Sequence, residues 1–554
     1  MSSLLIRQPT VCDDRIYGPD WRRWRDPEIP DRIEPVSWLL DRHHGTPVAD
    51  KTALLCGDDR ITYADLPVRI DRYAAALVRA GIGPETRLLL FGTDSLDYIL
   101  VWLAAVRLGG IPIVVSDLYK AKDLAYFLTD TAAPVLFIDA EQTPKLAETA
   151  SSLPASLKTI LVRGDVPAEV AALGDRRTVL QLAALTKEAG PAATPHQRHR
   201  NDITYMFYSG GTTGTAKGIT HLAHDFVLIP ERHGRFWDYK TDDVVFATSK
   251  KYFTHGLWPG VLIPLYWGCT IILERRPPTA DVVLAVLRDR SVSKLITVPT
   301  VLKNIMQLLA RAGEPARLPD LEFVVAASEK MPPEMFERFR ELTGIELMDS
   351  IGSSEITYEW IANRPREFKR GSLGKPVFGY EIRLVTADGK DVTEPNVDGE
   401  AWVKSATSCF FYWRKYQESR NTFIGEWTRT GDVLRFDDDG FFWFSGRGND
   451  LFKIKGLWVS PLEIEAALTG HPAVHEAAVV SYEDEDGLTQ ARAFVVLREG
   501  YSETPDLTEE LRQNVAPLGT YKIPASIRFI DQLPRTTLLK IDRRALRAIN
   551  ERRT

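Results

Sequence analysis

The chain has 554 residues, with 69 Lys and Arg against 75 Asp and Glu, and 44% of its residues are hydrophobic. This is typical of a globular protein with more than one domain, and the formal net charge of −6 argues against general nucleic-acid binding, because no excess of cations is present to displace counterions. The four cysteines, Cys12, Cys56, Cys269 and Cys409, are far apart in sequence and fit neither a disulfide framework nor a metal site, so a reducing cytoplasm is expected.

No signal peptide or membrane span is expected. The N-terminal residues lack a basic leader followed by an apolar stretch. The most apolar region, residues 98–115, is interrupted by Arg107 and by the pair Gly109-Gly110, which favours a buried helix followed by a strand.

Short apolar runs alternate with helical patterns through the first part of the chain. Strands are expected at residues 87–92, 111–116, 134–139, 159–162, 244–248, 270–274, 294–298 and 323–327, and a helix at 97–108. Such alternation predicts largely parallel sheets covered by helices. Residues 186–200 are polar, contain Gly and Pro, and are expected to form a surface connection.

The pattern becomes richer in short strands beyond residue 371, with strands expected at 400–403, 433–436 and 441–445 and a hairpin turn at 437–440. Ser460, followed by Pro461 and Glu463, predicts a helix start that runs through residue 468, with strands near 477–482 and 493–497. The expected fold class is therefore α/β. A large N-terminal domain of helix-covered sheets with a β-rich subdomain covers residues 1–448, and a small α+β domain covers 449–554.

The sharpest local signal is the segment YSGGTTGTAKGITH at residues 208–221. It places three hydroxyls among three glycines, followed by a lysine, in Ser209, Gly210, Gly211, Thr212, Thr213, Gly214 and Lys217. Glycines let backbone N–H groups approach a polyphosphate, hydroxyls add donors, and a lysine adds positive charge. A flexible surface loop of the same composition is the alternative.

This loop resembles the phosphate loop of the adenylate-forming enzymes, the superfamily of acyl- and aryl-CoA ligases, peptide-synthetase adenylation domains and luciferases. Five further segments resemble motifs of that superfamily, in the same order, from about Ile61 to Arg547. The resemblance implies ATP, Mg²⁺ and coenzyme A as cofactors. It also implies an ATP- and acid-binding N-terminal domain and a mobile C-terminal domain with a catalytic lysine.

The segment DSIGSSE at 349–355 resembles the adenine-loop motif. The resemblance implies Glu355 as the Mg²⁺ ligand, for which a hard oxygen ligand is suited, and Ser353 and Ser354 as nucleotide-binding residues. Ile351 stands where much of the superfamily has an aromatic residue, and it is similar to the benzoate–CoA ligase branch. Taken alone, Glu355 would more often be a solvated or capping carboxylate.

Three later segments resemble motifs of the same superfamily. Asp432 and Arg447 match the residues that contact the ribose of ATP, and Lys540 matches the catalytic lysine that meets the carboxylate and the α-phosphate. The hinge falls on Asn449 and Asp450, with Asn in place of the usual Asp, and Lys455 and Gly456 match a loop that faces the active site in the thioester-forming state. Leu539 replaces a glycine, which implies a stiffer loop before Lys540.

The resemblance also implies which residues line the pocket for the acid. The segment KKYFTHG at 250–256 and its surroundings supply the candidates, which are Tyr252, His255, Trp258, Ser328, Ile351 and Gly352. Most of them are apolar or aromatic, as a ring requires. Ser328 stands where related enzymes often have Gly, so its side chain either narrows one end of the site or adjusts loop packing. Outside the resemblance, a hydrogen-bonded loop histidine is the more usual reading of His255.

The expected function is ATP-dependent acid–CoA ligation. An aromatic or other cyclic carboxylic acid, with a bulky polycyclic acid included, is activated as acyl-AMP and transferred to CoA, giving acyl-CoA, AMP and pyrophosphate. The alternatives are an adenylating enzyme that loads a carrier protein, a luciferase-like oxygenase, and a catalytically silent nucleotide or acyl-CoA sensor. The expected partners are small molecules, with the protein a monomer or homodimer.

Overall fold

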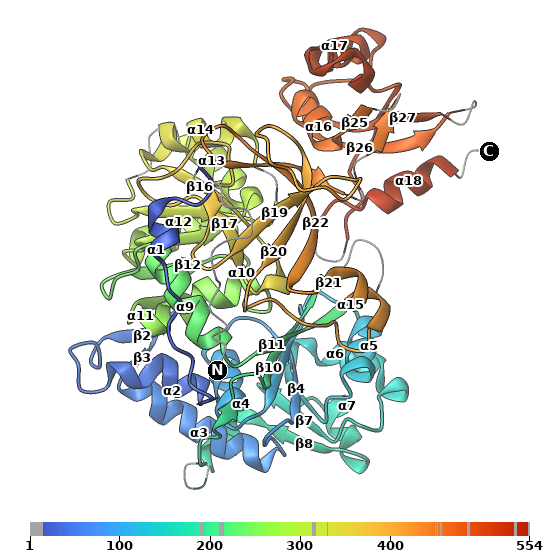
Figure 1. Ribbon diagram of the computed structural model, residues 1–554. Coiled ribbons are helices and arrows are strands. Elements are labelled where there is room, and N and C mark those ends of the chain that lie inside the picture. The colour runs from blue at the N-terminus through green and yellow to red at the C-terminus, as the bar shows by residue number, and fades with distance from the viewer. Residues whose placement is uncertain are drawn as a thin grey trace. The chain divides into compact units, whose positions relative to one another are not determined.

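The computed structural model describes residues 15–188, 190, 193–209, 215–312, 317–329, 331–448, 450, 452–454, 457–484, 488–536 and 540–551. The chain divides into two compact units (Figure 1). Unit 1 comprises Met1–Ile382, Val403–Arg429 and Asp439–Phe441, and unit 2 comprises Arg383–Trp402, Thr430–Asp438 and Phe442–Thr554.

The first sheet of unit 1 has seven strands in the order β11-β10-β5-β4-β6-β7-β8. The strands are β4 Arg87–Phe91, β5 Ile111–Val114, β6 Val135–Asp139, β7 Thr159–Arg163, β8 Thr178–Gln181, β10 Ile203–Ser209 and β11 Lys217–Leu222. All pairings are parallel except that of β10 with β11. Runs such as LLLF within β4 are buried on both faces, which is the pattern of a parallel sheet between helices.

The second sheet of unit 1 has nine strands in the order β18-β17-β16-β15-β14-β12-β13-β2-β3. They are β2 Thr52–Cys56, β3 Asp59–Thr62, β12 Val244–Ala247, β13 Thr270–Leu273, β14 Lys294–Thr297, β15 Phe323–Ala326, β16 Leu347–Gly352, β17 Glu359–Ala362 and β18 Lys375–Pro376. The strands from β2 to β16 are parallel, whereas the edges at β3 and β17-β18 are antiparallel. The predicted parallel sheets are thus confirmed.

Helices of unit 1 cover both sheets (Figure 1). They are α1 Pro19–Arg23, α2 Pro35–Leu40, α3 Asp65–Arg79, α4 Leu96–Arg107, α5 Ala121–Thr131, α6 Thr143–Glu148, α7 Ala168–Ala171, α8 Leu182–Lys187, α9 Asp225–Phe236, α10 Thr254–Leu257, α11 Ile263–Trp267, α12 Ala280–Asp289, α13 Pro299–Ala312, α14 Pro333–Thr343 and α15 Tyr416–Thr422. None of the described helices combines the length and apolarity needed to cross a membrane.

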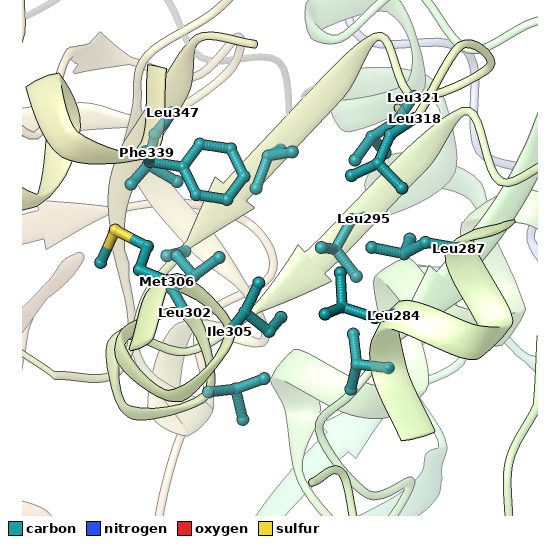
Figure 2. Packing of buried hydrophobic residues seen from close by; sticks show 14 of the residues in the cluster. Leu284, Leu287, Leu295, Leu302, Ile305, Met306, Leu318, Leu321, Phe339 and Leu347 are labelled. Atoms are coloured by element: carbon teal, nitrogen blue, oxygen red, sulfur yellow. The ribbon is translucent and has the colours of Figure 1, made fainter. Parts of the chain in front are cut away.

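A large hydrophobic core lies between the second sheet and the helices α12, α13 and α14. Figure 2 shows Leu302, Ile305 and Met306 of α13 facing side chains from α12 and the neighbouring strands. Their spacing of three and four residues places them on one helical face. Leu295 of β14 and Leu347 of β16 fill the same core. Each such side chain contributes about 1.5–3 kcal/mol of transfer free energy when fully buried, which holds β14–β16 against their helices.

Unit 2 contains the small α+β region. Its elements are β24 Phe452–Ile454, β25 Leu457–Val459, α16 Pro461–Thr469, β26 Val474–Glu483, β27 Thr489–Leu497, α17 Pro505–Val515, β28 Ser526–Phe529 and α18 Arg543–Glu551. The strands β26-β27-β28 form one sheet. A hairpin joins β22 Trp427–Phe436 to β23 Phe442–Arg447, as the turn at 437–440 predicts. The strands β19 Glu381–Val385, β20 Gly399–Lys404 and β21 Phe423–Ile424 complete that hairpin's sheet.

Two local predictions differ from the structure. Ser460 precedes α16 as predicted, but its hydroxyl donates to the Ser445 carbonyl (2.5 Å) instead of capping the helix, and Glu463 pairs with Lys522. The expected surface connection at 186–200 includes the short strand β9 Arg198–His199, which pairs with β1 Arg32–Ile33. For Ser460, a partner outside the helix takes the hydroxyl that a helix cap would use. For residues 198–199, pairing with a strand distant in sequence orders the backbone.

Candidate active site

The predicted phosphate loop joins two paired strands. Ser209, at the end of β10, lies opposite Lys217, at the start of β11, and residues 210–214 between them are outside the described part of the chain. Helix α5 braces both arms, since Tyr208 donates to Asp130 (2.6 Å) and Tyr126 donates to the Ala216 carbonyl (2.7 Å). The hairpin therefore holds the two ends of the loop at a fixed separation.

Glu355 lies in the 3₁₀ turn that follows β16. The Tyr412 hydroxyl donates to Glu355 Oε1 (2.9 Å), and the Cys409 N–H donates to the Glu355 carbonyl (2.7 Å). The Lys217 ammonium lies over the ring of Tyr412, 4.6 Å from its centroid. The structure thus brings together two predicted residues, Lys217 and Glu355, around Tyr412, which the sequence analysis missed and which no local motif announces.

Strain marks the turn after Glu355. Thr357 has a φ of 83°, in the left-handed region that costs a β-branched residue about 1–3 kcal/mol. Its hydroxyl lies 2.9 Å from the Thr407 carbonyl and 3.0 Å from His221 Nδ1, and these contacts hold it there. His221 Nε2 in turn donates to the Ser354 carbonyl (2.7 Å). The backbone that presents Glu355 is therefore held from several sides.

The predicted serines beside this turn have different surroundings. Ser354 Oγ lies 3.5 Å from the Thr254 hydroxyl. Ser353 Oγ is buried and has no hydrogen-bond partner among the described residues. Leaving a buried hydroxyl without a hydrogen bond costs free energy. Ser353 is therefore suited to form a hydrogen bond with a bound ligand.

The donor set fits Mg²⁺ that arrives with a nucleotide. Among the described residues, no group of three or more His, Cys, Asp or Glu side chains is placed to hold a metal ion. Mg²⁺ commonly binds one or two carboxylates, with substrate phosphates and water completing its shell. The single carboxylate of Glu355, with one oxygen hydrogen-bonded to Tyr412, matches that mode.

His255, on α10, is hydrogen-bonded at both ring nitrogens. Nε2 lies 3.0 Å from the Thr297 carbonyl, and Nδ1 lies 2.9 Å from Glu359 Oε1. Because a carbonyl only accepts, Nε2 carries a proton. Glu359 is 2% exposed and lies opposite Gly352 in the β16-β17 pair, where a Cβ on Gly352 would come within 2.8 Å of Glu359 Oε2. The sequence analysis missed Glu359, although it lies only four residues beyond Glu355.

The other candidates for the acid pocket differ in how far they are buried. Tyr252 is buried and Ile351 half-buried, whereas Trp258 is fully buried and packs on Phe226, 5.5 Å between ring centroids. Ser328 is exposed, with a φ of 74°. That conformation favours glycine, the residue that the resemblance leads one to expect there.

A buried ion pair fixes the segment that carries Tyr252 and His255. The Lys251 ammonium lies 3.0 Å from Asp94 Oδ2, and the Lys251 N–H donates to Asp94 Oδ1 (2.9 Å). The two side chains are 1% and 3% exposed. The carbonyls of Ala247 and Ser249 also accept from Lys251 (3.2 Å each).

Asp349, also on β16, is a buried carboxyl group whose pKa is raised well above its usual value by burial, with a further contribution from Glu359. A raised pKa in the folded state stabilises the protein at low pH, and this stabilisation is lost as pH rises. We expect Asp349→Asn to be more stable than the wild type at neutral pH, with a difference that shrinks as pH falls to about 4. The free energy of unfolding of both proteins, measured across pH, checks this; a difference independent of pH would contradict it.

In unit 2, the two predicted ribose-binding residues form a pair. Asp432 on β22 lies opposite Arg447 on β23, with Arg447 Nε 2.8 Å from Asp432 Oδ1. Arg447 also donates to the Thr430 carbonyl (3.1 Å). The carboxylate is buried, and the arginine is 53% exposed.

The remaining predicted residues also belong to unit 2. Lys540 is exposed in a turn closed by the bridge between Arg535 and Ile541. Asp450 forms ion pairs with Arg543 (3.6 Å) and Arg547 (3.5 Å). The hinge residue Asn449, together with Lys455, Gly456 and Leu539, lies outside the described residues.

Comparisons with known proteins identify the family to which the chain belongs. Residues 41–413 match the model of the AMP-binding enzyme family, and residues 463–540 match that of the AMP-binding enzyme C-terminal domain. The chain is 35% identical to a 4-hydroxybenzoate–CoA/benzoate–CoA ligase of Rhodopseudomonas palustris, over 92% of this chain and 93% of the relative. It is 33% identical to a benzoate–CoA ligase of Thauera aromatica, over 94% and 97%.

Solved structures of similar fold also include aryl-CoA ligases. An anthranilate CoA ligase in complex with anthranoyl-AMP superimposes with a TM-score of 0.84 at 31% identity, over 94% of this chain and 98% of that one. A benzoate CoA ligase from Burkholderia xenovorans gives a TM-score of 0.80 at 31% identity, over 93% and 100%. The predicted fold class is confirmed, and the chain belongs to the AMP-binding enzyme family, within the adenylate-forming superfamily that its motifs resemble.

Proposed function

We propose that this AMP-forming acid–CoA ligase activates an aromatic carboxylic acid of the benzoate class. Its substrates and cofactors are a small carboxylic acid, ATP, Mg²⁺ and CoA, as predicted from the sequence. The observation that carries the choice of acid is the likeness, over more than nine-tenths of the chain, to benzoate, hydroxybenzoate and anthranilate CoA ligases. Because ATP and CoA are intracellular metabolites, a cytoplasmic location is part of the proposal.

In the first step, a carboxylate oxygen of the acid attacks the α-phosphorus of ATP, and pyrophosphate leaves as acyl-AMP forms. The hairpin from Ser209 to Lys217 receives the phosphates, and Glu355 would hold Mg²⁺, which would supply positive charge to neutralise the triphosphate. Asp432 and Arg447 hold the ribose. Lys540 donates to the oxygens of the reacting carboxylate and α-phosphate, where negative charge concentrates in the transition state.

In the second step, the sulfur of the CoA thiol attacks the acyl carbon, the thiol proton passes to water, and AMP leaves with the electrons of the acyl–oxygen bond. We assign residues 449–554 to a mobile domain that pivots at Asn449 and Asp450. Its rotation withdraws Lys540 and brings in the loop of Lys455 and Gly456. The described ion pairs of Asp450 with α18 support this assignment, because they tie the pivot to the C-terminal helix.

The choice of acid is tested by ATP–pyrophosphate exchange without CoA, across benzoates, cyclohexane carboxylates, polycyclic acids and fatty acids. We expect exchange with the benzoates, because the chain resembles benzoate and hydroxybenzoate CoA ligases over more than nine-tenths of its length. A strong preference for a long linear acid over every cyclic acid would contradict the proposal.

A further inference from the structure

Tyr412 occupies a fixed place beside the phosphate hairpin. It is 4% exposed and packs with Ile219, Cys409 and Phe423. Its backbone bridges to Ile219 of β11, and the next residue, Trp413, donates its N–H to the Gly218 carbonyl (2.7 Å). The ring is therefore packed against the strand that begins at Lys217.

The hydroxyl of Tyr412 fixes one side of Glu355. It donates to Oε1 over 2.9 Å, and this occupies one carboxylate oxygen and restricts rotation of the side chain. Burial, with the charge of Glu355, raises the pKa of Tyr412 well above its usual value. The hydroxyl accordingly keeps its proton, and remains a donor, throughout the neutral pH range.

The ring face of Tyr412 contacts the ammonium group of Lys217. Lys217 Nζ lies 4.6 Å from the ring centroid, within the range in which a cation–π contact contributes about 0.5–2 kcal/mol. One aromatic side chain thus contacts both groups that a metal-bound triphosphate requires, the lysine through its face and the carboxylate through its hydroxyl. A tyrosine serves both contacts, whereas phenylalanine would keep only the first.

We propose that Tyr412 is a positioning residue for the metal-bound nucleotide: it holds Glu355 ready to bind Mg²⁺ and keeps Lys217 beside it on the ring face. This rests on the proposed function, since Glu355 and Lys217 take their ligands from it. Tyr412 itself does not touch the reacting atoms in this scheme.

The test is Tyr412→Phe, which removes the hydroxyl and keeps the ring. The affinity for ATP is measured by calorimetric titration at a series of Mg²⁺ concentrations. We expect the variant to need about tenfold more Mg²⁺ to reach half of the full increase in ATP affinity, because it loses a hydrogen bond to a charged group, and such hydrogen bonds are the stronger ones. ATP affinity in EDTA should be unchanged. Denaturant unfolding verifies that the variant is as stable as the wild type.

A double-mutant cycle with Glu355→Gln separates positioning from a general structural effect. If Tyr412 acts through Glu355, Tyr412→Phe has little further effect on the Mg²⁺ requirement in the Glu355→Gln protein. Tyr73→Phe is the matched control, since it removes a hydroxyl that donates to another carboxylate, Asp97, between α3 and α4. It should leave the Mg²⁺ requirement at the wild-type value.

Additive effects of the two substitutions, or an equal shift in Tyr73→Phe, would overturn the proposal. The binding experiment needs no acid and no turnover. If the wild type binds ATP with Mg²⁺ but exchanges pyrophosphate with no acid, the choice of substrate fails while the role of Tyr412 is still decided. If Mg²⁺ does not strengthen ATP binding by the wild type, the role of Tyr412 is refuted.

Discussion

Lys540→Ala is expected to slow acyl-AMP formation by about 100- to 1000-fold, the cost of removing a donor aimed at transition-state charge. Thioester formation from supplied benzoyl-AMP and CoA should keep its wild-type rate, because the proposed second step proceeds with Lys540 withdrawn. ATP–pyrophosphate exchange measures the first step, and release of AMP from benzoyl-AMP measures the second. Lys540 is exposed on a turn, so its removal creates no cavity that would confuse the result.

Lys390→Ala provides the matched control for this variant. Lys390 is also in unit 2, its side chain is 79% exposed, and it pairs with Asp388 at 2.8 Å. Both half-reactions should proceed normally in that protein. Equal loss of both steps in Lys540→Ala would contradict the assigned role, since a lysine that serves only adenylation cannot limit attack by the thiol.

Lys251→Met is expected to lower the free energy of unfolding by about 3–5 kcal/mol, because it leaves the carboxylate of Asp94 buried without its partner. The pair is almost fully enclosed, so water cannot replace the lost cation. Urea denaturation of the wild type and the variant measures the difference. Adenylation with saturating acid should also fall, because the segment that carries Tyr252 and His255 loses its anchor.

Two further variants make this prediction specific. The double replacement Asp94→Leu with Lys251→Met should recover much of the stability, since both charges are then removed together. Arg338→Ala breaks the pair with Glu341, whose side chains are 50% and 61% exposed, and should cost less than about 1 kcal/mol. A loss in Lys251→Met as small as that in Arg338→Ala would show that the buried pair contributes little.

The strands and the motifs could be predicted from the sequence because each depends on a short stretch of chain. After Arg87 the residues of β4 are all apolar, and the turn after β22 has its own residue signature, so both were correctly predicted. The chain order of the motifs singles out Glu355 and Lys217, whose roles stay predictions, and the structure places both beside Tyr412.

The contacts that orient the site could not be predicted in this way. Tyr412 is 57 residues from Glu355, and His255 is 104 residues from Glu359. Each pair meets only in the folded protein, and no local sequence pattern indicates the contact. Ser460 makes the same point, since its sequence fits a helix cap but its hydroxyl is used by Ser445.

The buried pair of Lys251 and Asp94 joins the two sheets of unit 1. Asp94 follows β4 of the first sheet, and Lys251 follows β12 of the second. The first sheet carries the hairpin for the phosphates and the second carries the strand that leads to Glu355. The pair is thus one of the links that fix the separation of the two sheets, together with the hydrogen bond from His221 of β11 to the Ser354 carbonyl. In the proposed reaction, that separation sets the distance between the acid's carboxylate and the α-phosphorus. A shift of about 1 Å between the two sheets is therefore expected to slow acyl-AMP formation by about 100-fold.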